Sequence, residues 1–305
     1  MISSTLSPIS PAIDTLVIIP ARWGSSRFPG KPLTPLAGKS LLERVHDAAI
    51  YATKTLPHVA VIVATEDSRV CQHAHSFGAN AIITSDQCAT GTDRAHATLE
   101  ALSQSSPTAV QASTSIKDKT LPHINWIINL QGDAPLTPPR VIQQLIQRLR
   151  SNPDIGVLTP VTQLSWSALD AFRANKITTP HSGTTVTIDA HERALWFSKQ
   201  IIPAIRQEAT QREQSTLSPV WHHIGLYGYR RDALERFVAL PISQYETLEG
   251  LEQLRLLENH IPIHTLPVDP NEISLGNMSA LSGVDTPEDA ERITAWLNQY
   301  GDPWL

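Results

Sequence analysis

The sequence predicts an α/β protein with a mostly parallel, twisted sheet, helices on both faces of that sheet, and an antiparallel excursion in the second half. Short apolar runs without alternation, such as residues 16–19, are typical of strands buried on both faces of a parallel sheet. Stretches with apolar residues at helical spacing separate these runs, which is the strand–helix alternation of a parallel sheet. Beyond about residue 165 this alternation gives way to a hairpin pattern.

The first half of the chain contains repeated strand–helix units. The first strand, 16–19, ends at Pro20, and the helix Leu41–Thr53 follows after a turn rich in glycine and basic residues. Gly78 is typical of the residue that ends a helix. The same reasoning predicts strands at 58–64, 81–84 and 125–130, and helices that end near 77 and span 94–102 and 139–151.

The second half begins with a strand at 155–161 and a short helix at 165–172. Segments 184–188 and 194–198 predict a hairpin, and the polar stretch 206–218 predicts an outward loop. The remaining pattern predicts strands at 223–229 and 263–268 and helices at 232–239, 247–259 and 287–300. We find no clean linker, so we expect one domain over 15–305 with an excursion at about 165–230.

Composition limits the classes of function. The 305 residues carry a net charge of −5 with 17% charged residues, which predicts no general nucleic-acid binding surface. Cys71 and Cys88 lack metal-type spacing and suggest reduced thiols. Residues 1–14 predict a disordered extension rather than a secretory signal, and no apolar run is long enough to cross a membrane. We therefore expect a soluble, cytoplasmic protein with no membrane partner.

A cationic turn follows the first strand. Arg22, Arg27 and Lys31 lie within ten residues, together with Gly24 and Gly30. Glycines let backbone N–H groups approach an anion, arginine forks match phosphate oxygens, and lysine adds a mobile charge. The position after a strand is where open α/β sheets bind ligands, so the turn predicts a polyphosphate site rather than a solvated basic loop. Its spacing matches neither the P-loop nor the dinucleotide fingerprint.

Two aspartates at distant positions could hold a metal ion. Asp133 follows the strand at 125–130, and Asp285 precedes the closing helix. Magnesium commonly uses one or two protein carboxylates together with substrate phosphates and water. From spacing alone two other interpretations stay open: Asp133 can be a turn residue, and Asp285 can be part of an ordinary N-terminal helix cap.

Several motifs resemble one family. The stretch VIIPARWGSSRFPGKPL resembles the first motif of the 3-deoxy-manno-octulosonate cytidylyltransferases, or CMP-Kdo synthetases. LQGDAPLTPP resembles their QGDEP motif, and GVDTPEDAERI resembles their VDTPEDLERV motif. VIVATEDSRV, TGTDRAHA, ALWFSKQIIP, HHIGLYGYR and ETLEGLEQLRLLENHIPI resemble further motifs in the same order, over about residues 16–300. The chain is identified as a member of this family, which implies a fold similar to the nucleotide-diphospho-sugar transferases.

The resemblance also implies roles for individual residues. The catalytic residues would be Arg22, Arg27, Lys31 and Asp133. The nucleotide would be bound by Pro20, Ala21, Arg22, Lys31, Thr90, Gly91, Arg94 and Asp133. The sugar would be bound by Gln131, Lys199, His223, Glu246, Glu252 and Gln253. Magnesium would be held by Asp133 and Asp285.

The chain departs from the family pattern at three positions. Ala134 stands where the family usually has Glu, and Lys199 and His222 stand where it usually has Arg. Lysine offers a point charge in place of a bidentate fork, so these departures bear on which sugar is bound rather than on the reaction. The chain also has insertions at 103–122 and 269–281 relative to the family pattern.

The resemblance implies transfer of CMP from CTP to a 2-keto-3-deoxy sugar acid, with release of pyrophosphate, in lipopolysaccharide biosynthesis. It also implies a homodimer, through residues 184–198. Three alternatives stay open: activation of an amino-substituted Kdo or another nonulosonic-type acid, a glycosyltransferase on a similar sheet, and a non-catalytic nucleotide sensor. The chain lacks the Asp-x-Asp motif usual in such glycosyltransferases, and a sensor should have lost Lys31, Asp133 or Asp285.

Overall fold

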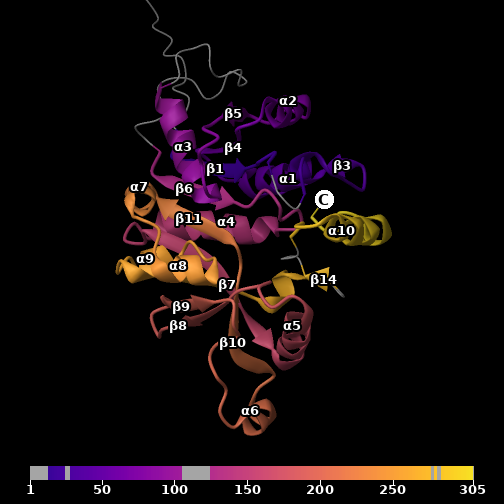
Figure 1. Ribbon diagram of the computed structural model, residues 1–305, viewed down its shortest axis with the longest axis vertical. Helices are drawn as coiled ribbons and strands as arrows, with labels where there is room; N and C mark the ends of the chain where they lie inside the picture. Colours follow the sequence, from indigo (N-terminus) through magenta and orange to yellow (C-terminus); the bar gives the residue numbers. More distant parts are fainter. Residues whose placement is uncertain (1–12, 25–27, 105–123, 276–277, 280–282, 305) are drawn as a thin grey trace, which may run out of the picture.

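A ten-stranded sheet forms the centre of the computed structural model, which describes residues 13–24, 28–104, 124–275, 278–279 and 283–304 (Figure 1). The strands are, in sheet order, β5 (Ala81–Ile83), β4 (Val59–Thr65), β1 (Thr15–Pro20), β6 (Trp126–Leu130), β11 (Leu226–Arg230), β7 (Val157–Ser165), β10 (Leu217–His223), β8 (Thr185–Ile188) and β9 (Ala194–Ser198), with β12 (His264–Val268) paired to β7. The predicted α/β class is confirmed.

The first half of the sheet is parallel. Strand β1 lies between β4 and β6, with Val17 opposite Val61 on one side and Ile128 on the other. Side chains alternate between two cores: Val17 and Ile19 face one, and Leu16 and Ile18 face the other. Burial on both faces explains why this strand is an unbroken apolar run.

Helices cover both faces of the sheet, as predicted. One core packs under α1 (Leu41–Thr53), α2 (Ser68–Ser76), α4 (Pro139–Ser151) and α10 (Pro287–Tyr300). The opposite core packs under α3 (Gly91–Gln104), α7 (Arg231–Ala239) and α9 (Leu254–Glu258). Helix α10 therefore brings the end of the chain back beside the first half of the sheet (Figure 1).

The second half is antiparallel at its centre, because β11 runs antiparallel to both β6 and β7. Residues 223–229 were predicted as one strand, which is wrong: β10 ends at His223 and β11 begins at Leu226, with both lying against β7. The single helix predicted at 247–259 is also two, α8 (Gln244–Glu249) and α9. Gly250 separates them with φ of 64°, a left-handed conformation that ends α8.

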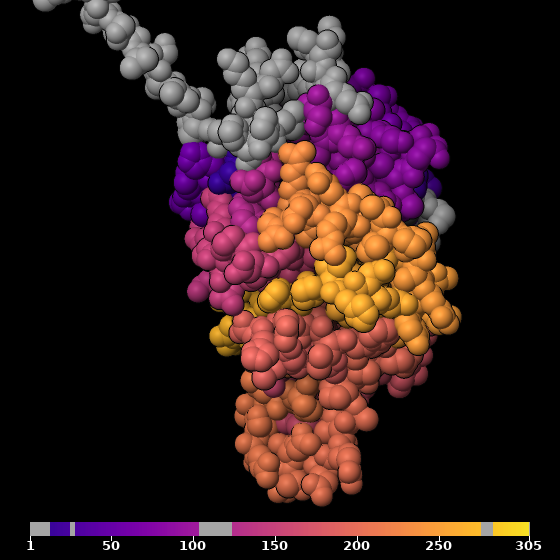
Figure 2. Space-filling view, turned by 90° about the vertical axis from the view of Figure 1, so that its left-hand side faces the viewer, coloured from indigo at the N-terminus to yellow at the C-terminus, as the bar shows by residue number. Residues whose placement is uncertain are grey.

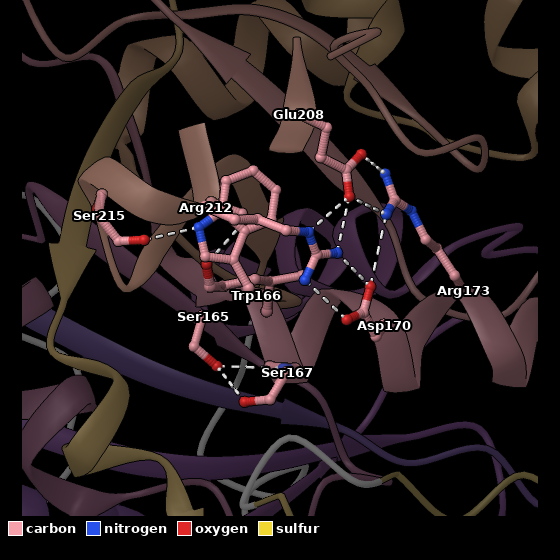
Figure 3. A network of polar contacts seen from close by, with 11 residues as sticks. Ser165, Trp166, Ser167, Asp170, Arg173, Glu208, Arg212 and Ser215 are labelled. Carbon is pink, nitrogen blue, oxygen red and sulfur yellow. Dashed lines mark hydrogen bonds and ion pairs between the residues drawn. The ribbon is translucent and has the colours of Figure 1, made fainter. Parts of the chain in front are cut away.

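The excursion forms a narrow lobe at the lower end of the molecule, which holds β8, β10, α5 (Trp166–Thr178) and α6 (Glu208–Gln214) (Figures 1 and 2). Helix α5 is longer than the predicted 165–172. Helix α6 occupies the stretch predicted as a loop, and it buries no residue. Arg173 instead clamps Glu208 with two hydrogen bonds of 2.8 and 2.9 Å, and Arg212 likewise clamps Asp170 (Figure 3).

The short elements complete the described chain: η1 (Lys31–Leu33), β2 (Pro35–Leu36), β3 (Lys39–Ser40), η3 (Pro270–Glu272), β13 (Ser274–Leu275) and β14 (Met278–Ser279). The predicted extension 1–14 lies outside the described residues apart from 13 and 14, as does the insertion 103–122 apart from 103 and 104. The insertion 269–281 is described only in part. No helix in the described ranges has the length and apolar character needed to cross a membrane.

Candidate active site

Lys31, Asp133 and Asp285 meet at the carboxyl end of the parallel strands. The Lys31 Nζ atom lies 2.9 Å from Asp133 Oδ2 and 3.7 Å from Asp285 Oδ1, and it donates a 2.9 Å hydrogen bond to the carbonyl of Val284. The Lys31 side chain is 16% exposed, and the two aspartates are 38% and 57% exposed. The start and the end of the chain, at Lys31 and Val284, thus meet 253 positions apart in sequence, and the two carboxylates beside Lys31 are open to a ligand.

Backbone contacts hold the two aspartate segments together. The Val284 N–H donates a 2.8 Å hydrogen bond to the carbonyl of Asp133. Gly132 lies so close to the end of β1 that a Cβ atom there would overlap the carbonyl oxygen of Pro20. The glycine before Asp133 is therefore required by this close approach, and it sets where the aspartate stands.

The helix cap after Asp285 is made by another residue. The Thr286 hydroxyl accepts from the Asp289 N–H, and the Asp289 side chain accepts in return, so Thr286 and Asp289 form a capping box for α10. Pro287 occupies the first helical position. The cap interpretation therefore holds for Thr286, and the Asp285 N–H joins this cap with a 3.0 Å bond to Asp289, while the Asp285 carboxylate lies by Lys31.

The pair Asp133 and Asp285 fits a magnesium ion in chemistry and position. Both carboxylates lie close to the Lys31 ammonium group, so their negative charges attract a cation to the same place. Within the described ranges no group of three or more His, Cys, Asp or Glu side chains forms a metal cage. Two carboxylates open to solvent suit magnesium, which takes its remaining ligands from phosphate and water.

The nucleotide residues predicted around β1 lie close to one another. Pro20 ends β1, and the Ala21 N–H continues the sheet with a 2.9 Å bond to Ala64. A Cβ atom at Gly91 would lie 3.5 Å from the Pro20 ring, so the start of α3 stands next to the end of β1. Thr90 exchanges hydrogen bonds with Asp93 at the start of α3, 2.8 Å and 3.1 Å long.

Arg22 connects the cationic turn to the segment before α3. Its guanidinium donates to the carbonyl of Ala89, just before Thr90. Gly30 has φ of 72° and packs against the Trp23 ring, over which the Arg69 guanidinium stacks at 3.6 Å from the centroid. The predicted catalytic residue Arg27 lies outside the described residues.

Arg94 is placed differently from a residue that touches a ligand. It is 1% exposed, forms a 2.9 Å ion pair with Glu66, and donates to the Thr84 hydroxyl at 2.7 Å. Glu66 in turn accepts from the Trp23 N–H at 2.9 Å. Arg94 therefore supports the cationic turn through Glu66, which contacts both. The sequence did not single out Glu66, because its position indicated only the end of a strand.

A cavity of about 230 Å³ extends from Asp133 into the second half of the sheet. It is open to solvent and mixes polar with apolar walls. Its lining residues are Leu130, Gln131, Asp133, Ala134, Thr137, Gly183, Thr184, His222, His223, Ile224, Gly225, Leu226 and Gly283. The structure therefore joins the aspartate site to Gln131 and His223, two of the predicted sugar-binding residues.

His223 is held as a neutral ring. Its Nε2 atom lies 2.9 Å from the hydroxyl of Thr159, and that hydroxyl donates to the carbonyl of Leu226 at 2.8 Å. The Thr159 oxygen must then accept from Nε2–H, which leaves Nδ1 as the acceptor. Burial lowers the pKa of His223 to about 3, and it lowers the pKa of the adjacent His222 to about 4.

Lys199 lies at the rim of this cavity. Its Nζ atom donates to the Thr184 hydroxyl at 3.2 Å, and its backbone N–H donates to Glu249 at 2.8 Å. Burial lowers the pKa of Lys199, and the charges of Glu249 and Asp285 oppose that shift. The Glu249 carboxylate also accepts from the Ser198 hydroxyl at 2.8 Å and so fixes the end of β9.

Three further predicted sugar residues come from α8 and from the link between α8 and α9. Glu252 accepts a 2.5 Å hydrogen bond from Thr92, and burial raises its pKa. Glu252 Oε2 and Gln253 Nε2 are buried, and neither has a hydrogen-bond partner among the residues that the structure describes. Glu246 instead forms a buried ion pair with Arg255 at 2.5 Å, so its contacts are those of a structural residue.

Comparison with known proteins agrees with this arrangement. Residues 16–263 match the family model described as "Cytidylyltransferase". The 3-deoxy-manno-octulosonate cytidylyltransferase of Maricaulis maris is 39% identical, over 95% of this chain and 99% of that protein. The enzyme of the same name from Chlamydia pneumoniae is 33% identical, over 92% of each chain.

Solved structures of cytidylyltransferases also resemble this chain. A CMP:2-keto-3-deoxy-manno-octonic acid synthetase complexed with CTP superposes with a TM-score of 0.70 at 34% identity, over 93% of this chain and 98% of that one. A cytidylyltransferase from Leptospira borgpetersenii, 15% identical with a TM-score of 0.53 over 94% and 88% of the two chains, shares the fold. The chain therefore belongs to the cytidylyltransferase family, and within it to the 3-deoxy-manno-octulosonate cytidylyltransferases.

Proposed function

We propose that this enzyme transfers CMP from CTP to 3-deoxy-manno-octulosonate, releasing pyrophosphate and supplying lipopolysaccharide biosynthesis. One observation carries the proposal: a cavity lined by Asp133, His223 and Thr184 has Lys31 paired to Asp133 at one end and Lys199 bonded to Thr184 at the other. A triphosphate at the cationic turn and a sugar acid at the other end would meet above Asp133. The relatives' names and the CTP-bound neighbour support this choice of substrates.

The chain's own residues would act by position and charge. The anomeric hydroxyl of the sugar acid would attack the α-phosphate in line, and the bond to pyrophosphate would break without a covalent enzyme intermediate. Lys31 and Arg22 would stabilise the charge that develops on the phosphates, with Arg27 in the same role. Pro20, Ala21, Thr90 and Gly91 would orient the nucleotide, with Arg94 behind them.

Magnesium would be held by Asp133 and Asp285. When bound, it would neutralise phosphate charge and polarise the attacking oxygen. Because Lys31 lies beside both carboxylates, its ammonium group would lie next to the phosphates that the same site would bind. The Ala134 departure removes a third carboxylate next to Asp133, which leaves the two aspartates as the charged ligands the protein offers here.

The sugar would lie between β10 and the start of α9. The unpaired buried atoms Glu252 Oε2 and Gln253 Nε2 are an acceptor and a donor that suit sugar hydroxyls. Neutral His223 would accept from a hydroxyl through Nδ1, with Gln131 nearby on the same cavity wall. Lys199 would pair with the substrate carboxylate. A homodimer that uses residues 184–198 stays a prediction.

The test is pyrophosphate release with CTP, magnesium and a panel of sugar acids: Kdo, an amino-substituted Kdo, a nine-carbon 2-keto acid and a blank without acid. We expect turnover with Kdo that EDTA abolishes and excess magnesium restores. Better turnover with another acid would move the specificity to that acid. No pyrophosphate with any acid would refute the proposed function. Sugar transfer to a lipid without use of CTP would identify a glycosyltransferase instead.

A further inference from the structure

Lys176, near the C-terminal end of α5, binds an unusual set of carbonyl groups. Its Nζ atom lies 2.7 Å from the carbonyl oxygen of Ser182 and 2.6 Å from that of Lys199, with Pro180 and Gly183 at 3.2 and 3.4 Å. An ammonium group has three protons, so these carbonyls use all of its donors. Lys176 therefore fastens two separate backbone segments to one point.

The first segment is the connection from α5 to β8. Gly183 lines the cavity and has φ of 66°, and a Cβ atom there would lie 2.5 Å from the Phe172 ring. Phe172 is one helical turn before Lys176, whose Nζ lies 4.8 Å from the centre of that ring. The end of α5 thus sets the position of the cavity rim at Gly183 and Thr184.

The second segment is the end of β9, which carries Lys199. Lys176 holds the Lys199 carbonyl, Glu249 holds its N–H, and the Thr184 hydroxyl accepts from its ammonium group. Every polar part of Lys199 is therefore anchored, and two of the anchors depend on where α5 ends. A misplaced Lys176 would shift both the charge and the rim.

The surroundings of Lys176 are also electropositive. Burial and then the charge of Lys199 lower the pKa of Lys176, and burial and then the charge of Lys176 lower the pKa of His222. Glu249 is the carboxylate that acts on Lys176, and Glu249 and Asp285 act on Lys199. Two ammonium groups in a half-buried site favour an anionic ligand at the cavity rim.

We propose that Lys176 is a positioning residue for the acidic sugar substrate. It fixes the Lys199 ammonium group and the Gly183–Thr184 rim at the carboxylate end of the cavity, and its own charge adds to the attraction. This inference rests on the proposed function. The phosphate end of the cavity, at Lys31 and Asp133, does not depend on it.

The test is steady-state kinetics of Lys176→Met with CTP and Kdo varied in turn. We expect the KM for Kdo to rise at least about tenfold, because a displaced carboxylate partner weakens binding in the ground state, while the KM for CTP stays within about twofold. Lys176→Arg keeps the charge and should recover part of the affinity. Lys54→Met, on the exposed end of α1, is the matched control and should change neither KM.

A merely structural role would give a different result. Equal increases in both KM values, or a lower kcat at unchanged KM, would overturn the inference, and so would an unchanged KM for Kdo. Thermal unfolding identifies a variant that fails to fold. If Lys176→Met fails to fold, the two KM values are measured for Lys176→Gln, which keeps hydrogen-bond donors but loses the charge. Wild-type turnover separates the failure of the proposed function from the failure of the Lys176 assignment. If the wild-type enzyme is inactive with every acid, the proposed function fails; if it is active and Lys176→Met leaves the KM for Kdo unchanged, only the Lys176 assignment fails.

Discussion

Replacing Lys31 with Met should separate catalysis from stability. The Lys31 ammonium group contacts Asp133 at 2.9 Å, Asp285 at 3.7 Å and the Val284 carbonyl at 2.9 Å. The two carboxylates are 38% and 57% exposed, and ion pairs open to solvent contribute about 0–1 kcal/mol each. We therefore expect the free energy of unfolding to fall by no more than about 2 kcal/mol, with the hydrogen bond to Val284 included.

The rate should change far more. Removing one donor that stabilises developing charge commonly lowers kcat by ~10²–10³. The same variant should bind magnesium more tightly in the absence of CTP, because the ammonium group no longer neutralises the two carboxylates. Pyrophosphate release measures the rate, and calorimetric titration with magnesium measures the affinity.

The control is Lys39→Met, which removes another lysine of the same region that pairs with a carboxylate, Asp47. It should leave kcat unchanged. The reasoning is refuted if Lys31→Met keeps more than about a tenth of the wild-type kcat, since a charge-stabilising donor should supply at least a tenfold effect. It is also refuted if magnesium binds more weakly to that variant than to wild type.

Three other predictions concern Gly132, His223 and Glu252. Gly132→Ala forces a Cβ atom against the Pro20 carbonyl and should destabilise the protein by about 1–3 kcal/mol in chemical unfolding, whereas Gly24→Ala, in open space, should not. The buried His223 ring stays neutral until about pH 3, so below about pH 6.5 the unfolded state takes up the proton first. As the pH decreases below that value, the free energy of unfolding should decrease by up to about 1.4 kcal/mol per pH unit because of this group. His223→Gln should make this dependence on pH less steep, and an unchanged steepness would contradict the assignment. Glu252→Gln should raise the KM for Kdo about tenfold at constant KM for CTP; equal effects on both would show a structural role.

The parts of the fold that were predictable are those in which one local signal decides the structure. The unbroken apolar run of β1 and the helical spacing of α1 each depend on burial against the same sheet. The convergence of Asp133 and Asp285 was less accessible, because it depends on α10 returning to the first half of the sheet. Spacing left both aspartates ambiguous, and the family resemblance alone singled them out.

The errors have physical causes as well. Helix α6 has no buried face, so no apolar pattern could reveal it; paired charges such as Arg173 with Glu208 hold it against α5 (Figure 3). The hydrogen bonds from Arg173 and Arg212 lower the pKa of Glu208 to about 2. The break between β10 and β11 falls inside a mostly apolar stretch, and Gly250 falls between two segments that both have a helical pattern, so composition changes too little at either place to mark an end.

The two ends of the cavity differ in how they hold charge. At the phosphate end, Lys31 contacts exposed carboxylates and can change partners when ligands bind. At the sugar end, Lys199 is fixed by Thr184, Glu249 and, through its carbonyl, by Lys176. A mobile charge suits a phosphate group that changes during the reaction, whereas a fixed charge suits a carboxylate that does not. Since a lysine cannot form the two parallel bonds of an arginine fork, the anchoring around Lys199 supplies the orientation that its own side chain lacks.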